Sequence, residues 1–206
     1  LIGSSAGGNL TSGSNYNVMI GDASGTTDAT NLHHCVFVGR NTGTAMTGGV
    51  GDGTVLVGGK AGAAITSGTE NLAIGYEAMT EHTTGDKNIA IGYGAMDGTQ
   101  AGGTQTTSAG SDNNVFIGYD AGGGAWEDTA SQLNVGIGNY VMDAAMDGAV
   151  SNTAIGYSSG SALTTADYNT LIGASAGALL ESGNGNVLIG YQAGDEMTDN
   201  ASNVVI

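Results

Sequence analysis

The 206-residue sequence contains no proline, one cysteine, and only 3 lysine and arginine residues against 19 acidic residues. Without proline, every backbone N–H is free to join a hydrogen-bonded array. The single cysteine, Cys35, excludes an internal disulfide framework. The formal net charge of −16 comes without any cluster of basic residues that could neutralise phosphates. This balance argues against binding to nucleic acid or to an anionic membrane surface.

Aromatic residues (5%) and charged residues (11%) are also scarce, a mixture that fits neither an average enzyme nor a charged disordered chain. No apolar run approaches the roughly 20 residues that a membrane-spanning helix needs. The first residues lack the basic and apolar regions of a secretion signal, so for an exported protein that signal would lie outside this segment. We therefore expect no membrane insertion in this segment. Glycine, by contrast, supplies 39 residues, which indicates many tight turns.

One nine-residue phrase recurs along the whole chain, for example as NVLIGYQAG at 186–194 and NVFIGYDAG at 114–122. The first copy has its register glycine at Gly3, and successive copies follow at intervals of 17 to 20 residues, except for one interval of 26. The other turn glycines of the repeat are Gly21, Gly39, Gly58, Gly75, Gly92, Gly118, Gly138, Gly156, Gly173 and Gly190. Self-similarity at a fixed period predicts an all-β fold, a parallel β-solenoid of about eleven coils that spans 1–206 as a single array with about 17–18 residues per coil.

Each repeat predicts two short strands per coil joined by glycine turns. The first four residues alternate in the β pattern, so that Val187 and Ile189 form the inside wall and Ala193 a tight corner. A second, weaker apolar position follows, as at Leu163 and Leu180.

Asparagine opens most copies of the phrase, and Cys35 and Thr54 are the two departures. Because stacked coils lie about 4.8 Å apart, identical amides in register can hydrogen-bond along the stack. We therefore expect a structural asparagine ladder rather than a catalytic role. Its members are Asn17, Asn71, Asn88, Asn114, Asn134, Asn152, Asn169, Asn186 and Asn203.

The residue between the two inward-facing aliphatic residues is apolar or glycine in every copy and should point to the opposite face of the strand. An exposed apolar column of this length needs a partner, and a symmetric homo-oligomer is the most economical one. The sequence thus predicts an oligomer interface that contains Met19, Phe37, Leu56, Phe116, Leu171, Leu188 and Val205.

The phrase N-x-A-I-G-Y-x-A-G, followed by T-T-G-x-x-N, resembles the repeats of bacteriophage tail-fibre proteins. Its shorter core, N-x-A-I-G-x-x-A/S, is similar to the left-handed parallel β-roll repeats of trimeric autotransporter adhesin heads, whose coils are shorter. The resemblance extends over the whole chain. It implies a homotrimeric fibre located on a virion or on an extracellular cell surface.

These features predict a passive structural shaft, a segment of a longer phage tail fibre that presents a host-recognition tip, because the chain starts and ends within a phrase. The alternative is the head or stalk of a bacterial trimeric surface adhesin that binds matrix or glycans. A third hypothesis is an ice-binding solenoid, since threonine recurs in one column, as at Thr66 and Thr164.

Two features are not required by the repeat architecture and are candidate ligand contacts, for example with a host-surface glycan or receptor. One is the tyrosine column that follows the register glycine. The other is the interval between Gly92 and Gly118, with a loop insertion near 98–112, followed by the single tryptophan. Structural packing is the interpretation that we favour for both features. The candidate contact residues are Tyr76, Tyr93, Tyr119, Tyr157, Tyr191 and Trp126.

No catalytic residue, cofactor or metal site is predicted. His33, His34 and Cys35 are the one compact group of metal-ligand types, but adjacent residues of a strand face opposite sides and cannot share one ion. G-x-S-x-G and G-K-[ST] motifs are absent from the sequence. The sequence therefore indicates that this segment is not an enzyme.

Overall fold

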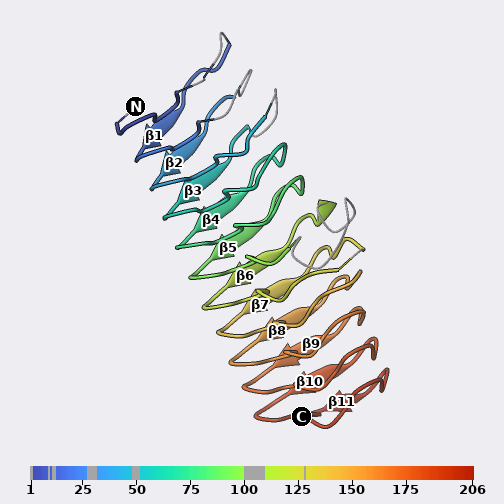
Figure 1. Ribbon diagram of the computed structural model, residues 1–206. Helices are drawn as coiled ribbons and strands as arrows, with labels where there is room; N and C mark the ends of the chain where they lie inside the picture. The colour runs from blue at the N-terminus through green and yellow to red at the C-terminus, as the bar shows by residue number, and fades with distance from the viewer. Residues whose placement is uncertain are drawn as a thin grey trace.

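The computed structural model describes residues 2–8, 10, 13–26, 32–47, 52–99, 110–127 and 129–206. Eleven short strands in these residues form one parallel sheet in sequence order. They are β1 (Val18–Ile20), β2 (Val36–Val38), β3 (Val55–Val57), β4 (Leu72–Ile74), β5 (Ile89–Ile91), β6 (Val115–Ile117), β7 (Val135–Ile137), β8 (Thr153–Ile155), β9 (Thr170–Ile172), β10 (Val187–Ile189) and β11 (Val204–Val205). Figure 1 shows the coils stacked one behind the next, with the chain termini at opposite ends of the stack. The predicted parallel β-solenoid is confirmed.

The strands pair residue for residue with no slip anywhere in the stack. Even across the 26-residue interval, Ile89 of β5 pairs with Val115 of β6. The surplus residues of the predicted insertion at 98–112 therefore do not disturb the register of the sheet. Residues 100–109 of that insertion lie outside the described residues.

The prediction of two strands per coil is wrong for the described residues, because each coil contributes a single named strand. The residue before each ladder position has a left-handed backbone, as at Lys87 (φ 59°) and Tyr168 (φ 58°), and this conformation interrupts an extended strand. Outside the named strands, parallel β-pairing between coils is reduced to isolated bridges, for example between Gln132 and Val150. Backbone hydrogen bonds nevertheless join these irregular segments from coil to coil, as from the Thr66 N–H to the Thr83 carbonyl at 2.8 Å.

The two faces of each strand are the reverse of those predicted. The middle residue of every three-residue strand is buried, whereas the first and third residues are partly or fully exposed. A coil of about 17 residues encloses an interior so narrow that one side-chain column per strand fills it. The prediction that Val187 and Ile189 form the inside wall is therefore wrong.

The predicted oligomer interface is accordingly also wrong, since its residues belong to the chain's own core. The members that are fully buried, with 0% exposure, are Met19, Phe37, Leu56, Phe116, Leu171 and Leu188. Val205, in the terminal strand, is partly buried against the same core.

Side chains of unequal size fill the core by compensating for one another between coils. A Cβ atom built at Gly136 would lie 2.6 Å from the Phe116 ring, so the large residue on β6 requires the small one on β7. Ala193 is buried at the corner, as predicted, and the equivalent Ala78 and Ala121 are fully buried. Close packing of this kind makes each interior position depend on the coils above and below it.

The asparagine ladder runs without interruption from Asn71 to Asn203. At each step one side-chain oxygen accepts hydrogen bonds from the backbone N–H and the side-chain amide of the next asparagine; Asn88 contacts Asn71 in this way at 2.9 and 3.2 Å. The remaining N–H of Asn88 donates to the Ser111 carbonyl at 2.8 Å. The steps are Asn71–Asn88–Asn114–Asn134–Asn152–Asn169–Asn186–Asn203. These amides are thus occupied in structural hydrogen bonds.

Asn17 lies outside this continuous ladder because Cys35 and Thr54 occupy the next two rungs. Its side-chain oxygen accepts a hydrogen bond from the Cys35 backbone N–H at 3.0 Å. The Asn17 amide donates to the Leu32 carbonyl at 2.7 Å. Asn17 therefore stabilises one junction between coils rather than a long column.

The register glycines are required for two physical reasons. Their φ angles lie between 131° and 146°, a region that residues with a side chain rarely adopt. In most coils a Cβ atom would also overlap the backbone of the next register glycine; at Gly156 it would meet the Gly173 carbonyl. At Gly190, the last register glycine, the nearest atom to such a Cβ is 3.9 Å away.

This difference provides a matched pair of substitutions. Gly190→Ala should cost about 1–3 kcal/mol of unfolding free energy, because it strains the backbone alone. Gly156→Ala should cost about 1–3 kcal/mol more, because it adds overpacking between two coils. Thermal or denaturant unfolding followed by circular dichroism measures both losses. Equal losses in the two variants would contradict the close approach of successive coils.

Candidate functional site

The tyrosine column lies at the carboxyl ends of the strands, directly after the register glycines. Its exposed fractions range from 42% at Tyr119 to 77% at Tyr191. The rings of Tyr76 and Tyr93 stack at 5.5 Å between centroids, and those of Tyr93 and Tyr119 at 5.2 Å. Three successive coils therefore carry a continuous aromatic stack at the edge of the sheet.

Three further contacts extend this stack, two at one end and one at the other. Tyr140, which the sequence prediction did not include, meets Tyr119 and Tyr157 edge to face at 5.3 and 5.9 Å. At the other end the Lys60 ammonium lies 5.6 Å from the Tyr76 ring centroid. Tyr140 could have been found from the sequence as a tyrosine shifted by one residue, directly after Asn139, which occupies the usual tyrosine position.

This geometry limits what the tyrosines can bind. Both faces of the Tyr93 ring are covered by neighbouring tyrosines, so a sugar ring cannot stack on it without separating the column. Solvent reaches the column at its outer edge, where a ligand could meet the rings edge-on or hydrogen-bond to a phenol group. The stack therefore favours a role in coil stability, with Tyr191 the most accessible of the predicted contacts.

Trp126 is not a ligand contact, and that prediction is wrong. Its side chain has 0% exposure and packs edge-on against Phe116, with 5.8 Å between centroids. The indole N–H donates to the Gly122 carbonyl at 3.0 Å. A buried indole with its one donor satisfied is a core residue.

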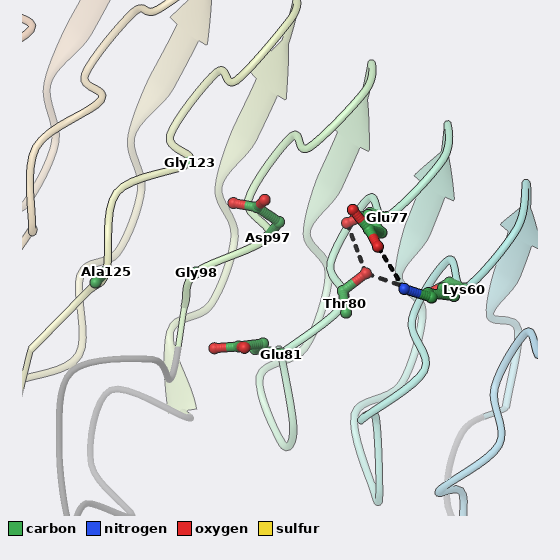
Figure 2. Close-up of a pocket in the computed structure, with 8 residues that line it drawn as sticks. All are labelled: Lys60, Glu77, Thr80, Glu81, Asp97, Gly98, Gly123 and Ala125. Carbon is green, nitrogen blue, oxygen red and sulfur yellow. Dashed lines mark hydrogen bonds and ion pairs between the residues drawn. The ribbon is translucent and has the colours of Figure 1, made fainter.

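A shallow groove of about 450 Å³ crosses the coils beside the stack, lined by Lys60, Glu77, Thr80, Glu81, Asp97, Gly98, Gly123 and Ala125. Figure 2 shows the ion pair between Lys60 and Glu77, whose Nζ and Oε1 atoms are 2.6 Å apart. The Thr80 hydroxyl donates to the Glu77 carbonyl at 2.8 Å. Gly98, the first residue of the predicted insertion, lies on the groove wall. The groove was not predicted from the sequence; its carboxylates, Glu77, Glu81 and Asp97, come from two successive repeats.

Carboxyl groups dominate the electrostatics of this region. Burial and the nearby charges of Asp120, Glu81 and Glu77 raise the pKa of Asp97 to about 6. Burial and Asp120 likewise raise the pKa of Asp143 to about 6. Asp97 can therefore hold a proton in the groove up to about pH 6. The described part of the chain contains no group of three or more His, Cys, Asp or Glu residues placed to bind a metal ion.

His82 replaces the aliphatic residue that other coils place at the same core position, such as Ile65 and Leu163. Its ring is fully buried, with Nδ1 3.1 Å from the Thr99 hydroxyl and Nε2 3.1 Å from the Gly85 carbonyl. Burial lowers the pKa of His82, so the neutral ring is the folded form. The pair of His82 and Thr99 is a polar insert in the core next to the long interval.

His33, His34 and Cys35 do not converge on a common point. The His34 ring stacks on Tyr16 at 5.2 Å, and the Cys35 thiol contacts the His33 carbonyl at 3.3 Å. Burial raises the pKa of the Cys35 thiol to about 11, which keeps it protonated and unreactive. This segment therefore behaves as a structural junction between coils.

Comparison with known proteins does not add a family: no protein-family model, no curated protein and no solved structure matches the chain. Within the residues described, no helix is long and apolar enough to cross a membrane. The site must therefore be interpreted from its geometry.

Asp97→Asn tests whether ionisation of the Asp97 carboxyl destabilises the fold. The native pKa of about 6 exceeds the unfolded value of about 3.9, so ionising Asp97 weakens the fold as the pH rises from about 4 to 6. After allowance for solvent screening at this half-buried group, we expect the variant to gain about 1 kcal/mol at pH 8 and progressively less towards pH 4. Urea unfolding across this pH range measures the gain. Glu196→Gln, at an exposed carboxylate, is the control, and an equal gain there would contradict the assignment.

His82 should make the fold sensitive to acid. Because its native pKa is lowered, the unfolded chain takes up a proton first below about pH 6.5, and stability then falls by up to about 1.4 kcal/mol per pH unit. The double variant His82→Leu with Thr99→Ile replaces both partners by apolar residues and should remove this dependence. Unfolding at pH 7 and pH 5 compares it with wild type and with His34→Gln, which should keep the wild-type slope. A wild-type slope in the double variant would exclude His82 as the cause.

Proposed function

We propose that this chain is a segment of an extracellular fibre shaft, with a phage tail fibre as the first assignment. The observation that supports it most directly is the uninterrupted register of eleven strands, maintained even across the long interval. With about 4.8 Å per coil, ten steps between strands extend the stack by about 48 Å. A structure that lengthens by a fixed step per repeat suits a spacer between a particle and its target.

The polar groups of the array also favour a mechanical role. The amides of the asparagine ladder are engaged within the stack, and both faces of the Tyr93 ring are covered by Tyr76 and Tyr119. Such groups resist separation of the coils but leave little chemistry free for a substrate. The shaft proposal is consistent with both features.

The runner-up is the head or stalk of a bacterial trimeric adhesin that binds matrix or glycans. It is favoured by the accessible outer edge of the tyrosine column and by the neighbouring groove. An ice-binding role has less support, because threonine hydroxyls of the repeated column are used between coils. Thr66 and Thr164 donate to carbonyls of the next coil at 3.2 and 3.1 Å.

Immunogold labelling separates these proposals. Antibodies raised against the folded chain should label tail fibres of virions produced by cells that carry the gene, and Fab fragments directed at the shaft should leave receptor binding unaffected. Labelling of the cell surface, with blocked adhesion, would instead support the adhesin. Labelling confined to the cell interior would exclude both, and serum pre-absorbed with the chain is the control.

A further inference from the structure

The tyrosine stack spans the longest interval of the array. Tyr93 follows the register glycine after β5 and Tyr119 the one after β6, so the two residues lie at opposite ends of the 26-residue interval. Their rings nevertheless stack with 5.2 Å between centroids and 8° between planes. A hydrogen bond of 3.0 Å from the Asp120 backbone N–H to the Tyr93 carbonyl joins the coils beside the rings. This pair is the closest and the most nearly parallel in the column.

The rings of this pair are open to small oxidants at their outer edges. The exposed fractions are 48% at Tyr93 and 42% at Tyr119. Other side chains that oxidants attack lie in the core of the same region, since Met79, Met96 and Trp126 have 0% exposure. A small oxidant that reaches these coils from solvent therefore meets the phenol rings first.

The charges beside the column favour removal of an electron at Tyr119. The negative charge of Asp120 is the largest cause of the raised pKa of Tyr119, so it acts directly on this phenol. The same charge stabilises a ring that has lost an electron. At the other end of the stack, the Lys60 ammonium lies 5.6 Å from the Tyr76 ring centroid and pairs with Glu77, so that end has no such excess of negative charge. Oxidation is therefore directed towards Tyr119.

The geometry also selects the partner of an oxidised Tyr119 ring. Two phenol rings couple through the carbons next to their oxygens, which requires the corresponding edges of the rings to lie side by side. Tyr93 and Tyr119 meet this requirement, because their rings are parallel and their strands pair in register about 4.8 Å apart. Tyr140, on the other side of Tyr119, presents an edge to a face at 64° and is poorly oriented for coupling.

We propose that Tyr93 and Tyr119 form an oxidative cross-linking site, at which a haem peroxidase with hydrogen peroxide converts the stacked pair into a dityrosine bridge. Each phenol loses one electron and its O–H proton and becomes a phenoxyl radical. The two radicals form one carbon–carbon bond between the ring carbons next to the oxygens. The hydrogen on each coupled carbon then moves to the oxygen, which restores both phenols. The two electrons and two protons removed reduce one hydrogen peroxide to two water molecules.

The bridge closes the junction that has the largest surplus of residues. Ile89 and Val115 already pair across this junction, so the bridge fits the folded stack without a change of register. A covalent link that closes a long loop stabilises a fold mainly by restricting the unfolded chain. The oxidised protein should therefore unfold at a higher temperature than the untreated protein. The inference concerns the folded array alone and does not depend on the shaft assignment.

The methionine positions allow the bridge to be mapped. Cleavage with cyanogen bromide after Met96 separates Tyr93 from Tyr119, and Met79 and Met142 bound the two fragments at their outer ends. Oxidation of the dilute folded chain with hydrogen peroxide and a haem peroxidase should join these two fragments. Their combined mass should be lower than the sum by two hydrogen atoms. The three methionines are fully buried, which protects them from oxidation before cleavage.

Matched phenylalanine variants test the assignment of the two rings. Tyr93→Phe and Tyr119→Phe each keep a ring in the stack but remove the hydroxyl, and each should lose most of the dityrosine fluorescence of the oxidised chain. Tyr168→Phe is the control, because Tyr168 is 67% exposed but its counterparts in the neighbouring coils are Ser151 and Gly185. This variant should cross-link like wild type. Circular dichroism before oxidation shows whether each variant is folded.

Four results would overturn the proposal. The first is a folded wild type without dityrosine under conditions that cross-link a free tyrosine peptide. The second is a doubled mass on a denaturing gel, because the bridge would then join two copies rather than two coils. The third is an equal yield from wild type and Tyr93→Phe. The fourth is the same pair of joined fragments from the urea-unfolded chain, since the stack would then not select the partner.

Discussion

The fold depends on the close approach of successive coils at the register glycines. At Gly156 there is no space for even one methyl group between its Cα and the backbone of the next coil. This contact fixes the spacing between coils and prevents the register from slipping. Once the spacing is fixed, each residue of one repeat lies directly above the equivalent residue of the next. The asparagine ladder, the tyrosine stack and the two outward columns formed by the first and third residues of the strands are all consequences of this alignment.

The narrow interior imposes a second constraint, which is conservation of volume between neighbouring coils. Phe116 on β6 is accommodated because β7 has glycine at the paired position, and Trp126 closes the remaining space against the same ring. This large cluster lies beside the longest interval of the array. On the other side of that interval, His82 and Thr99 occupy core positions that are aliphatic in regular coils. The irregular region thus keeps the strand register while exchanging aliphatic packing for aromatic and polar contacts.

The period, the parallel sheet and the asparagine column could be predicted from the sequence because each repeats identically and needs no knowledge of the interior. The orientation of the strands could not, since alternation defines two faces without saying which one is inside. Variation in side-chain size along a column is the signal that identifies the inner face. The middle column contains Phe116 and Gly136 as neighbours, as expected where volumes must compensate, whereas the flanking columns are Val, Ile or Leu except at Thr153 and Thr170. The acidic groove was missed because its residues come from several columns that meet only when the turns are folded.

The reversal of the two strand faces changes the reason for expecting a partner. The middle column of each strand, which was predicted to lie on the surface, forms the core, and the two flanking columns, which were predicted to lie inside, form the surface. In a stacked array, each added coil contributes the same increment of buried area to an interface between copies. The loss of translational and rotational freedom on association, by contrast, occurs only once, whatever the length. Stability of the assembly should therefore rise steeply with the number of coils, so that short arrays stay apart and long arrays associate. An interface distributed over many weak, identical rows also tolerates an occasional Thr153 or Thr170, which a small interface dominated by a few residues would not.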